Sequence, residues 1–262
     1  MFNLPRFDYK TEKNKAYGFF KEKGVVILKN SFDMELTEDM KRELSLTIQQ
    51  QVAKHLVSKT DDLLPGNVFD QGLIELSKEN DLLRRRLYEA IQTLPSLYKF
   101  TINSSFLKIA NDLGVKIPTV RTSQFRMDLP HDDRFLQGVH QEVRDIKSPN
   151  MIFMIVPLMD TSKEQGSLGI APGSHNLGPL TPSVSCDKEY QFIDPDKYKD
   201  YIFDQVEYAY GEVIVLNMYT LHGSFKNISN AIRWSSVFRC EDISNMPFLD
   251  GNDWHLTYTL KG

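Results

Sequence analysis

Apolar residues in the first 115 positions are mostly spaced as in amphipathic helices. One short apolar stretch, residues 24–28, interrupts this pattern and predicts a strand. From Leu36 to Leu56 an apolar side chain then recurs every four residues, which places these side chains on one face of a helix. Thr37 is expected to cap the N-terminus of this helix, and the acidic residues that follow it suit the positive first turn.

Two further helices are predicted before the pattern changes. Apolar residues between Leu73 and Leu94 form a second stripe, which Pro95 interrupts. A third helix is expected to end just before Gly114. Because each helix has one apolar face, we expect all three to pack against another layer of structure.

The second half of the chain has the pattern of β structure. From residue 115 onward, short stretches rich in β-branched and aromatic residues alternate with clusters of Gly, Pro, Asn and Asp. The candidate strands are residues 119–128, 150–158, 167–171, 205–208, 212–218 and 231–239. Because no long helices separate these strands, they favour an antiparallel sandwich or barrel over alternating βαβ units.

A single domain, residues 1–262, would account for both halves. No linker rich in Pro or Ser marks the transition, and no internal repeat is present. We therefore expect a mostly β fold with a helical flank, in which residues of about 1–115 pack on one sheet of a β core formed by about 116–245. Hydrophobic residues make up 41% of the 262 and charged ones 25%, which is typical of a globular protein.

The charge pattern argues against nucleic acid as a partner. The chain has 31 Lys and Arg against 35 Asp and Glu, a net charge of −4, and its longest run of like charges is Arg84–Arg86. Membrane insertion and export are not expected either, because the longest nearly unbroken apolar run, residues 151–159, is too short and the first 15 residues lack an apolar core. Cys186 and Cys240 fit no metal-binding spacing, so we expect buried free thiols in a reducing cytoplasm.

Two short motifs could bind a metal ion. Residues 131–133 (HDD) and 140–142 (HQE) each place a carboxylate two positions after a histidine. On an extended chain two such residues point to the same side and can bind one ion. A second histidine would complete a set of two imidazoles and one carboxylate, which leaves positions open for oxygen chemistry on Fe(II). Chance alone would give about one such triplet in this composition, so neither motif is decisive by itself.

The segment 211–239 offers the second histidine. A predicted strand, 212–218, leads to His222, a polar turn follows at 227–230, and the next strand carries Arg233. If these strands fold back on each other as a hairpin, His222 and Arg233 come to the same region. The guanidinium of an arginine has fixed planar donors and suits a deeply bound carboxylate.

Three motifs occur in a fixed order along the second half of the chain. They are His140-Gln141-Glu142, the stretch GSLGIAPGSH at 166–175, and His222-Gly223-Ser224 followed by Asn227, Ser229 and Arg233. In this combination, over about residues 119–240, the chain resembles the phytanoyl-CoA dioxygenase (PhyH-like) family of Fe(II)/2-oxoglutarate oxygenases. The resemblance implies a double-stranded β-helix, or jelly roll, with the N-terminal helices packed on one sheet.

The resemblance also implies roles for individual residues. His140, Glu142 and His222 would be the ligands of Fe(II), and Arg233 and Ser224 would bind the distal carboxylate of the co-substrate 2-oxoglutarate. O2 is the other co-substrate, and the implied products are a hydroxylated small molecule, succinate and CO2. The further candidates are Gln124 for the cofactor and Arg126, Gln141 and Arg144 for a small polar or anionic substrate.

Glu142 departs from the family's commonest motif, which ends in aspartate. Glutamate offers the same oxygen donor on a stem one methylene longer, so we expect iron binding to survive with a shifted geometry. The retained carboxylate also speaks against halogenation, in which related oxygenases give up this ligand so that a halide can bind. Hydroxylation is therefore the expected reaction.

Other interpretations compete with this one. The 131–133 triplet follows Pro130 in a charged stretch and is expected to lie in an exposed loop, and His175 is expected to belong to a turn. The main alternative function is a non-catalytic jelly roll that binds a sugar or small acid. A cupin-type isomerase is less favoured, because the sequence contains no His-x-His pair. Most aromatic residues are assigned to the core, although Trp234 and Phe125 flank site residues and could line the pocket.

Overall fold

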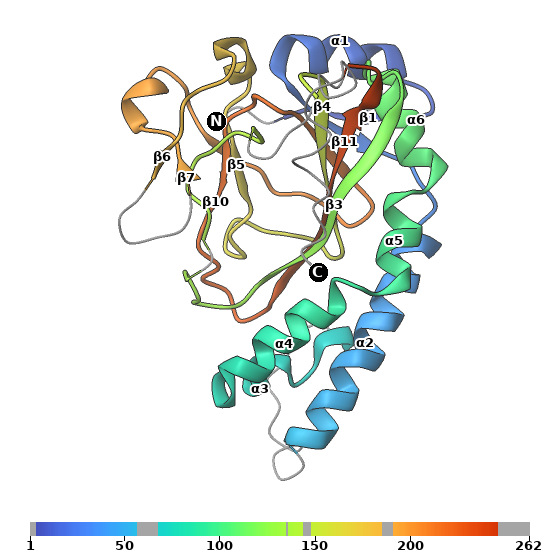
Figure 1. Ribbon diagram of the computed structural model, residues 1–262, viewed down its shortest axis with the longest axis vertical. Helices are drawn as coiled ribbons and strands as arrows, with labels where there is room; N and C mark the ends of the chain where they lie inside the picture. Colours follow the sequence, from blue (N-terminus) through green and yellow to red (C-terminus); the bar gives the residue numbers. More distant parts are fainter. Residues whose placement is uncertain (1–3, 57–67, 135, 144–147, 185–190, 246–262) are drawn as a thin grey trace, which may run out of the picture.

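The computed structural model describes residues 4–56, 68–134, 136–143, 148–184 and 191–245 (Figure 1). Its centre is a six-stranded sheet in the order β1-β2-β9-β4-β11-β3, antiparallel throughout except between β1 and β2. The strands are β1 (Arg6–Asp8), β2 (Val25–Lys29), β9 (Val213–Asn217), β4 (Met151–Pro157), β11 (Arg233–Asp242) and β3 (Pro118–Asp128). All of them except the short β1 coincide with stretches that the apolar pattern predicted as strands.

A smaller antiparallel sheet packs on one face of the large one. Its strands, in the order β10-β5-β8, are β10 (His222–Ser224), β5 (Leu168–Ile170) and β8 (Asp204–Gln205), and a separate pair is formed by β6 (Ser183–Val184) and β7 (Gln191–Phe192). Apolar side chains of both sheets, among them Ile155, Ile170 and Leu216, pack between them. This arrangement confirms the predicted jelly-roll fold class, although within the described residues the sheets do not close into a barrel.

The helices cover the opposite face of the large sheet. They are α1 (Lys13–Lys23), α2 (Glu35–His55), α3 (Leu73–Glu79), α4 (Asp81–Ile91), α5 (Pro95–Thr101) and α6 (Ser104–Asp112). Figure 1 shows α2, α5 and α6 alongside this sheet, with α3 and α4 packed against α2. The predicted apolar faces of the helices therefore pack against another layer of structure, as expected. Among the described helices, none combines the length and apolar character needed to cross a membrane.

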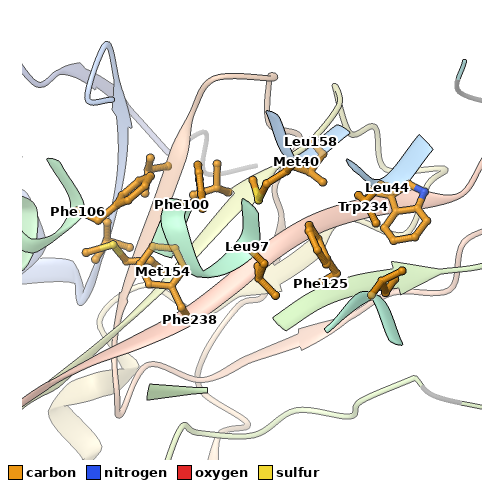
Figure 2. Close-up of a cluster of buried hydrophobic side chains, with 14 of the residues drawn as sticks. Met40, Leu44, Leu97, Phe100, Phe106, Phe125, Met154, Leu158, Trp234 and Phe238 are labelled. Carbon is orange, nitrogen blue, oxygen red and sulfur yellow. The ribbon is translucent and has the colours of Figure 1, made fainter. Parts of the chain in front are cut away.

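Aromatic side chains hold the helices to the sheet (Figure 2). The rings of Phe100 and Phe106, from α5 and α6, have centroids 4.7 Å apart, and Phe106 lies 5.2 Å from Phe238 of β11. Met40 and Leu44 of α2 belong to the same fully buried cluster. Tilted and edge-on ring contacts of this kind stabilise a core beyond the area they bury. The helical flank and the sheet thus share one hydrophobic core.

Helix boundaries differ from the sequence prediction at their caps. Thr37 does not cap the first long helix: α2 begins at Glu35, and the Thr37 hydroxyl instead donates to the Met34 carbonyl at 2.6 Å. The side chain of Asp33 accepts a hydrogen bond from the Glu35 N–H at 3.0 Å. Asp33 thus satisfies a free N–H at the start of the helix, which is the role predicted for Thr37. The second and third predicted helices are each divided in two, because Asn80 and Asn103 leave the helical conformation and cap new helices.

The Asn80 cap gives a stability prediction. Its side-chain oxygen accepts from the Leu83 N–H at 2.9 Å and satisfies one free donor at the start of α4. We expect Asn80→Ala to lower the free energy of unfolding by about 1 kcal/mol, and Asn80→Asp to preserve it, since aspartate caps equally well. Urea denaturation followed by circular dichroism measures both. Equal stability of the alanine and aspartate variants would contradict the assigned cap.

Residues of β11 alternate between the two faces of the large sheet. Trp234 is fully buried on the helical side, where its Nε1–H donates to Asp70 at 2.6 Å, and Phe125 belongs to the same core. The prediction that Trp234 and Phe125 could line the pocket is therefore wrong, because neighbours on a strand point to opposite faces. Cys240 is a buried free thiol, as predicted, and burial raises its pKa to about 12. Cys186 lies outside the described residues.

Candidate metal centre and pocket

Backbone pairing brings the two halves of the candidate metal site together. Residues 140–142 belong to no regular strand, yet His140 forms an isolated antiparallel bridge with His222 of β10. The His140 N–H donates to the His222 carbonyl at 2.9 Å, and the reverse bond measures 3.1 Å. The Glu142 N–H donates to the Met218 carbonyl at 2.9 Å. Because the segment is extended, His140 and Glu142 point to the same side.

Three ligand atoms converge in front of this bridge. Oε1 of Glu142 lies 3.6 Å from Nε2 of His140 and 3.3 Å from Nε2 of His222. The Nδ1 atoms of the two imidazoles lie 2.7 Å from the Gly138 carbonyl oxygen and 2.9 Å from that of Thr220. A carbonyl only accepts, so each Nδ1 donates its proton to a carbonyl, and each Nε2 is the nitrogen directed toward Glu142. Within the described residues, no other group of three His, Cys, Asp or Glu side chains is close enough to hold a metal ion.

The surroundings of Glu142 and His222 favour the protonation states that bind metal. Burial alone would raise the pKa of Glu142, but the two imidazoles and the charge of Arg239 hold that pKa well below its ordinary value. Burial and the neighbouring His140 lower the pKa of His222, against the opposing effect of Glu142. An ionised carboxylate and a neutral imidazole are the metal-binding forms.

The donor set fits Fe(II). Two imidazole nitrogens and one carboxylate oxygen form the facial set of non-haem iron enzymes, whereas a structural zinc site would use four protein ligands. The spacings of 3.3 and 3.6 Å between the glutamate oxygen and the histidine nitrogens are short enough for one ion to contact all three atoms. The ligands lie in the wall of a pocket, so further ligands can reach the ion.

This pocket has a volume of about 530 Å³, including its open mouth. Of the predicted cofactor and substrate residues, Gln124, Arg126, Ser224 and Arg233 line it. The apolar part of its wall comes from both sheets and consists of Phe153, Ile155, Leu168 and Val237. The pocket therefore combines one apolar wall with several convergent polar groups, as ligand sites usually do.

Arg233 is held from several sides. Its Nη2 and Nε donate to Oδ2 of Asp128 at 2.8 and 3.3 Å, and its Nη1 donates to the Gly166 carbonyl. Gly166 has a φ of +72°, and a Cβ there would clash with the Phe225 carbonyl oxygen, so the position requires glycine. Arg233 is buried with a fixed orientation, which is how a planar guanidinium recognises a carboxylate.

The structure corrects the prediction that Gln141 lies at the mouth of the pocket. Its side-chain amide donates to the carbonyls of Gly178 and Tyr219, both at 2.8 Å, and accepts from the Leu180 N–H at 2.8 Å. Between two metal ligands on an extended chain, its side chain has to point to the opposite side. Gln141 therefore fastens this segment to neighbouring backbone and does not line the pocket.

The other histidines and Arg144 are placed away from the metal ligands or are not described. His131 is exposed, as predicted for its loop, with a φ of +57°. His175 lies in a short 3-10 turn, where its Nε2 is 3.2 Å from the Lys21 carbonyl oxygen. Arg144 lies outside the described residues, so its predicted contact with the substrate stays a prediction.

His222 and Arg233 meet by a route that differs from the predicted hairpin. The strand before His222, β9, pairs with β2 and β4 in the large sheet, while β10 itself pairs with β5 in the small one. Arg233 begins β11, which pairs with β3 and β4. The two residues therefore face the pocket from different sheets, and the prediction of a direct hairpin between their strands is wrong.

Among the pocket residues that sequence reasoning missed are Arg239, Tyr208 and Phe153. Arg239 binds Oε2 of Glu142 through Nη2 at 2.5 Å and Nε at 2.7 Å, and its guanidinium lies 5.0 Å from the Phe153 ring. Tyr208 lines the same pocket as Arg233. The alternation along β11 was a usable signal for Arg239, because every second residue after Arg233 faces the pocket. Phe153 and Tyr208 reach it through sheet pairing, which the sequence does not reveal.

Solved structures share this fold at low sequence identity. AviO1 from Streptomyces viridochromogenes Tue57 is 15% identical, with a TM-score of 0.55 over 90% of this chain and 97% of that one. SnoK, a non-heme alpha ketoglutarate dependent carbocyclase from nogalamycin biosynthesis, is 17% identical, with a TM-score of 0.58 over 91% and 87%. The epimerase SnoN in complex with Fe3+, alpha ketoglutarate and nogalamycin RO is 15% identical, with a TM-score of 0.55 over 97% and 92%.

No curated protein sequence matches the chain. The family model of phytanoyl-CoA dioxygenase (PhyH) does match, and it extends over residues 20–235. This match includes helices α2 to α6, the small sheet, the three candidate metal ligands and Arg233. The chain therefore belongs to the phytanoyl-CoA dioxygenase family.

Proposed function

We propose that this protein is an Fe(II)/2-oxoglutarate-dependent oxygenase that hydroxylates a small polar or anionic molecule. One observation carries the proposal: the metal-ligand group and the buried guanidinium of Arg233 open onto the same pocket. A metal site alone would serve many reactions. A fixed arginine beside it also provides for a co-substrate with a carboxylate at each end.

Iron and 2-oxoglutarate suit these residues. His140, Glu142 and His222 would hold Fe(II), while Arg233 and Ser224 would bind the distal carboxylate of 2-oxoglutarate. The neighbouring fold of SnoN was solved with Fe3+ and alpha ketoglutarate, which supports this pairing of cofactors. When both are bound, the cofactors activate O2 for the oxidation of a substrate C–H bond, with succinate and CO2 released.

The protein's own task is to orient the reactants and to keep water out. Arg233 needs little rearrangement to bind a carboxylate, because Asp128 already fixes its guanidinium plane. The apolar wall of Ile155, Leu168 and Val237 lowers the local dielectric, which strengthens each polar contact inside the pocket. Reactants bound there are held close together and shielded from solvent.

An anaerobic titration tests this function. We expect 2-oxoglutarate added to the Fe(II)-loaded protein to produce a visible metal-to-ligand charge-transfer band. Succinate release in air then serves to screen substrates, and product mass separates hydroxylation, which adds one oxygen, from the epimerisation or ring closure associated with SnoN and SnoK. If iron binds and no band appears, the cofactor assignment fails, and the non-catalytic binding module becomes the better interpretation.

Arg126 gives a prediction about the substrate. It lines the pocket with a side chain 21% exposed, and it forms an ion pair with Asp128 at 3.3 Å. Among matched pairs of an acid and its neutral amide, we expect the acid to stimulate succinate release about tenfold more, the value of one charge-assisted hydrogen bond. Arg126→Gln should remove most of this preference.

The matched control for this test is Arg121→Gln. Arg121 lies on the same strand and pairs with Glu241 at 3.2 Å, outside the pocket lining. The control should keep the wild-type preference for acids. Equal stimulation by acids and amides in the wild-type protein would refute the anionic substrate class while leaving the oxygenase assignment intact.

A further inference from the structure

The two carboxylate oxygens of Glu142 have separate partners. Oε1 faces the histidine nitrogens at 3.3 and 3.6 Å, whereas Oε2 accepts a hydrogen bond from Nε of Arg239 at 2.7 Å and forms an ion pair with Nη2 of the same side chain at 2.5 Å. Glu142 is 7% exposed, so both oxygens are withdrawn from solvent. A charge-assisted hydrogen bond and an ion-pair contact with one guanidinium hold Oε2 in place, and Oε1 is the oxygen presented toward the metal-ligand nitrogens.

The longer stem of glutamate makes such a restraint necessary. Compared with aspartate, Glu142 has one more rotatable bond between its backbone and its carboxylate, so more orientations of the carboxylate compete with the metal-binding one. The backbone of this segment is already fixed, because the Glu142 N–H donates to the Met218 carbonyl. What remains free is the side chain, and the contacts of Arg239 fall at its far end.

Arg239 is itself pre-positioned. It lies on β11, on the same pocket-facing side of the sheet as Arg233, and it pairs in register with Phe153 of β4. The Phe153 ring centroid lies 5.0 Å from the Arg239 guanidinium carbon and 5.6 Å from the centroid of the His222 ring. Stacking on an aromatic face restricts the guanidinium and leaves its donors in the plane for Glu142. Arg239, Phe153 and His222 thus form a chain of contacts beside Glu142.

We infer that Arg239 is a positioning residue that fixes Glu142 as a ligand through a single oxygen. By occupying Oε2, it reserves Oε1 for the ion and keeps the remaining positions on the ion available to a co-substrate. It also adapts a His-x-Glu motif to a site more often built with His-x-Asp. This inference rests on the proposed function, because it requires that the three ligands bind a metal.

Metal affinity tests the inference without requiring turnover. Co(II) is titrated anaerobically into the full-length protein, and its visible ligand-field bands report both affinity and geometry. Loss of an outer partner of a metal ligand typically weakens binding about 10–100-fold, and we expect this range for Arg239→Gln together with altered bands. Arg239→Lys should recover part of the affinity, since it restores the charge without the two fixed donors.

A double-mutant cycle shows whether Arg239 acts through Glu142. Glu142→Asp shortens the ligand so that its carboxylate cannot reach Arg239 and Nε2 of the histidines together. In that background Arg239→Gln should weaken Co(II) binding by less than about threefold, because the interaction it removes is already absent. Arg121→Gln, which breaks the pair with Glu241, is the matched control and should bind Co(II) as the wild-type protein does.

The outcomes separate the inference from the proposed function. Failure of the folded wild-type protein to bind Co(II) would overturn the metal site itself. Normal binding by the wild-type protein and unchanged affinity and bands in Arg239→Gln would overturn the positioning role alone. An equal loss of affinity in the wild-type and Glu142→Asp backgrounds would also overturn it, since Arg239 would then act on the site by another route. Circular dichroism verifies folding of each variant.

Discussion

Replacing His222 by alanine is expected to abolish the charge-transfer band and to reduce succinate release by more than about 100-fold. His222 is 1% exposed, its Nδ1 is fixed by the Thr220 carbonyl, and its Nε2 faces Glu142 at 3.3 Å. Since loss of an outer-shell partner already costs about 10–100-fold in affinity or activity, loss of a ligand has to cost more. The anaerobic 2-oxoglutarate titration and a succinate assay measure the two effects.

The matched control for this prediction is His131→Ala. His131 begins the competing His-x-Asp triplet and is exposed, so the variant should keep both the band and the activity. Loss of the band in His131→Ala with its retention in His222→Ala would reverse the ligand assignment. Iron content measured on both proteins shows whether any loss of the band follows from loss of the metal.

Replacing Arg233 by glutamine is expected to weaken 2-oxoglutarate binding about 100-fold. A hydrogen bond to a charged group is worth about 1.5–3 kcal/mol, and every 1.4 kcal/mol corresponds to tenfold in affinity. The variant also breaks the ion pair with Asp128, so we expect the free energy of unfolding to fall by about 3 kcal/mol, the lower end for a buried pair. The loss of stability is not larger because Asp128 keeps its ion pair with Arg126 in the variant.

Two measurements separate these consequences of Arg233→Gln. The charge-transfer band followed against 2-oxoglutarate concentration gives the affinity, and urea unfolding gives the stability. Arg134→Gln breaks an exposed ion pair with Asp132, so it should leave the affinity unchanged and alter stability by less than about 1 kcal/mol. Wild-type affinity for 2-oxoglutarate in a folded Arg233→Gln protein would remove Arg233 from the cofactor site.

The sequence predicted the strands and helices well where an apolar period continued without interruption. The strand at residues 24–28 and the long helix after it are examples, because burial on one face selects the same period in sequence and structure. Helix ends were predicted less well. Asn80 and Asn103 divide two predicted helices, and a cap depends on one local hydrogen bond that the apolar stripe does not record.

Three errors or omissions at the site have a common cause. Closeness in sequence to a site residue places Trp234 and Gln141 at the pocket, and it leaves out Arg239, which is farther along the chain. On an extended chain the immediate neighbours of a site residue point away from the site, and residues an even number of positions away point toward it. This rule excludes Trp234 and Gln141 and includes Arg239, which is six positions after Arg233.

Which strands pair with each other cannot be predicted from this sequence, for a different reason. Residues 212–239 contain β9, β10 and β11, which are consecutive in the chain yet divided between two sheets. Such pairing is set by contacts between distant segments, for instance β9 with β2 and β10 with β5. The apolar pattern shows that a segment is a strand and which face is buried, and it contains no information about the partner strand.

The large sheet also divides the molecule into two parts that can change independently. Its helical face carries the aromatic core, and its other face carries pocket side chains such as Gln124 and Ser235. Within β11 a pocket residue and a core residue are immediate neighbours in sequence yet are separated by the thickness of the sheet. Selection or protein engineering can therefore exchange Arg126 and Ser235 for new substrate specificity while leaving the packing that holds the fold together untouched.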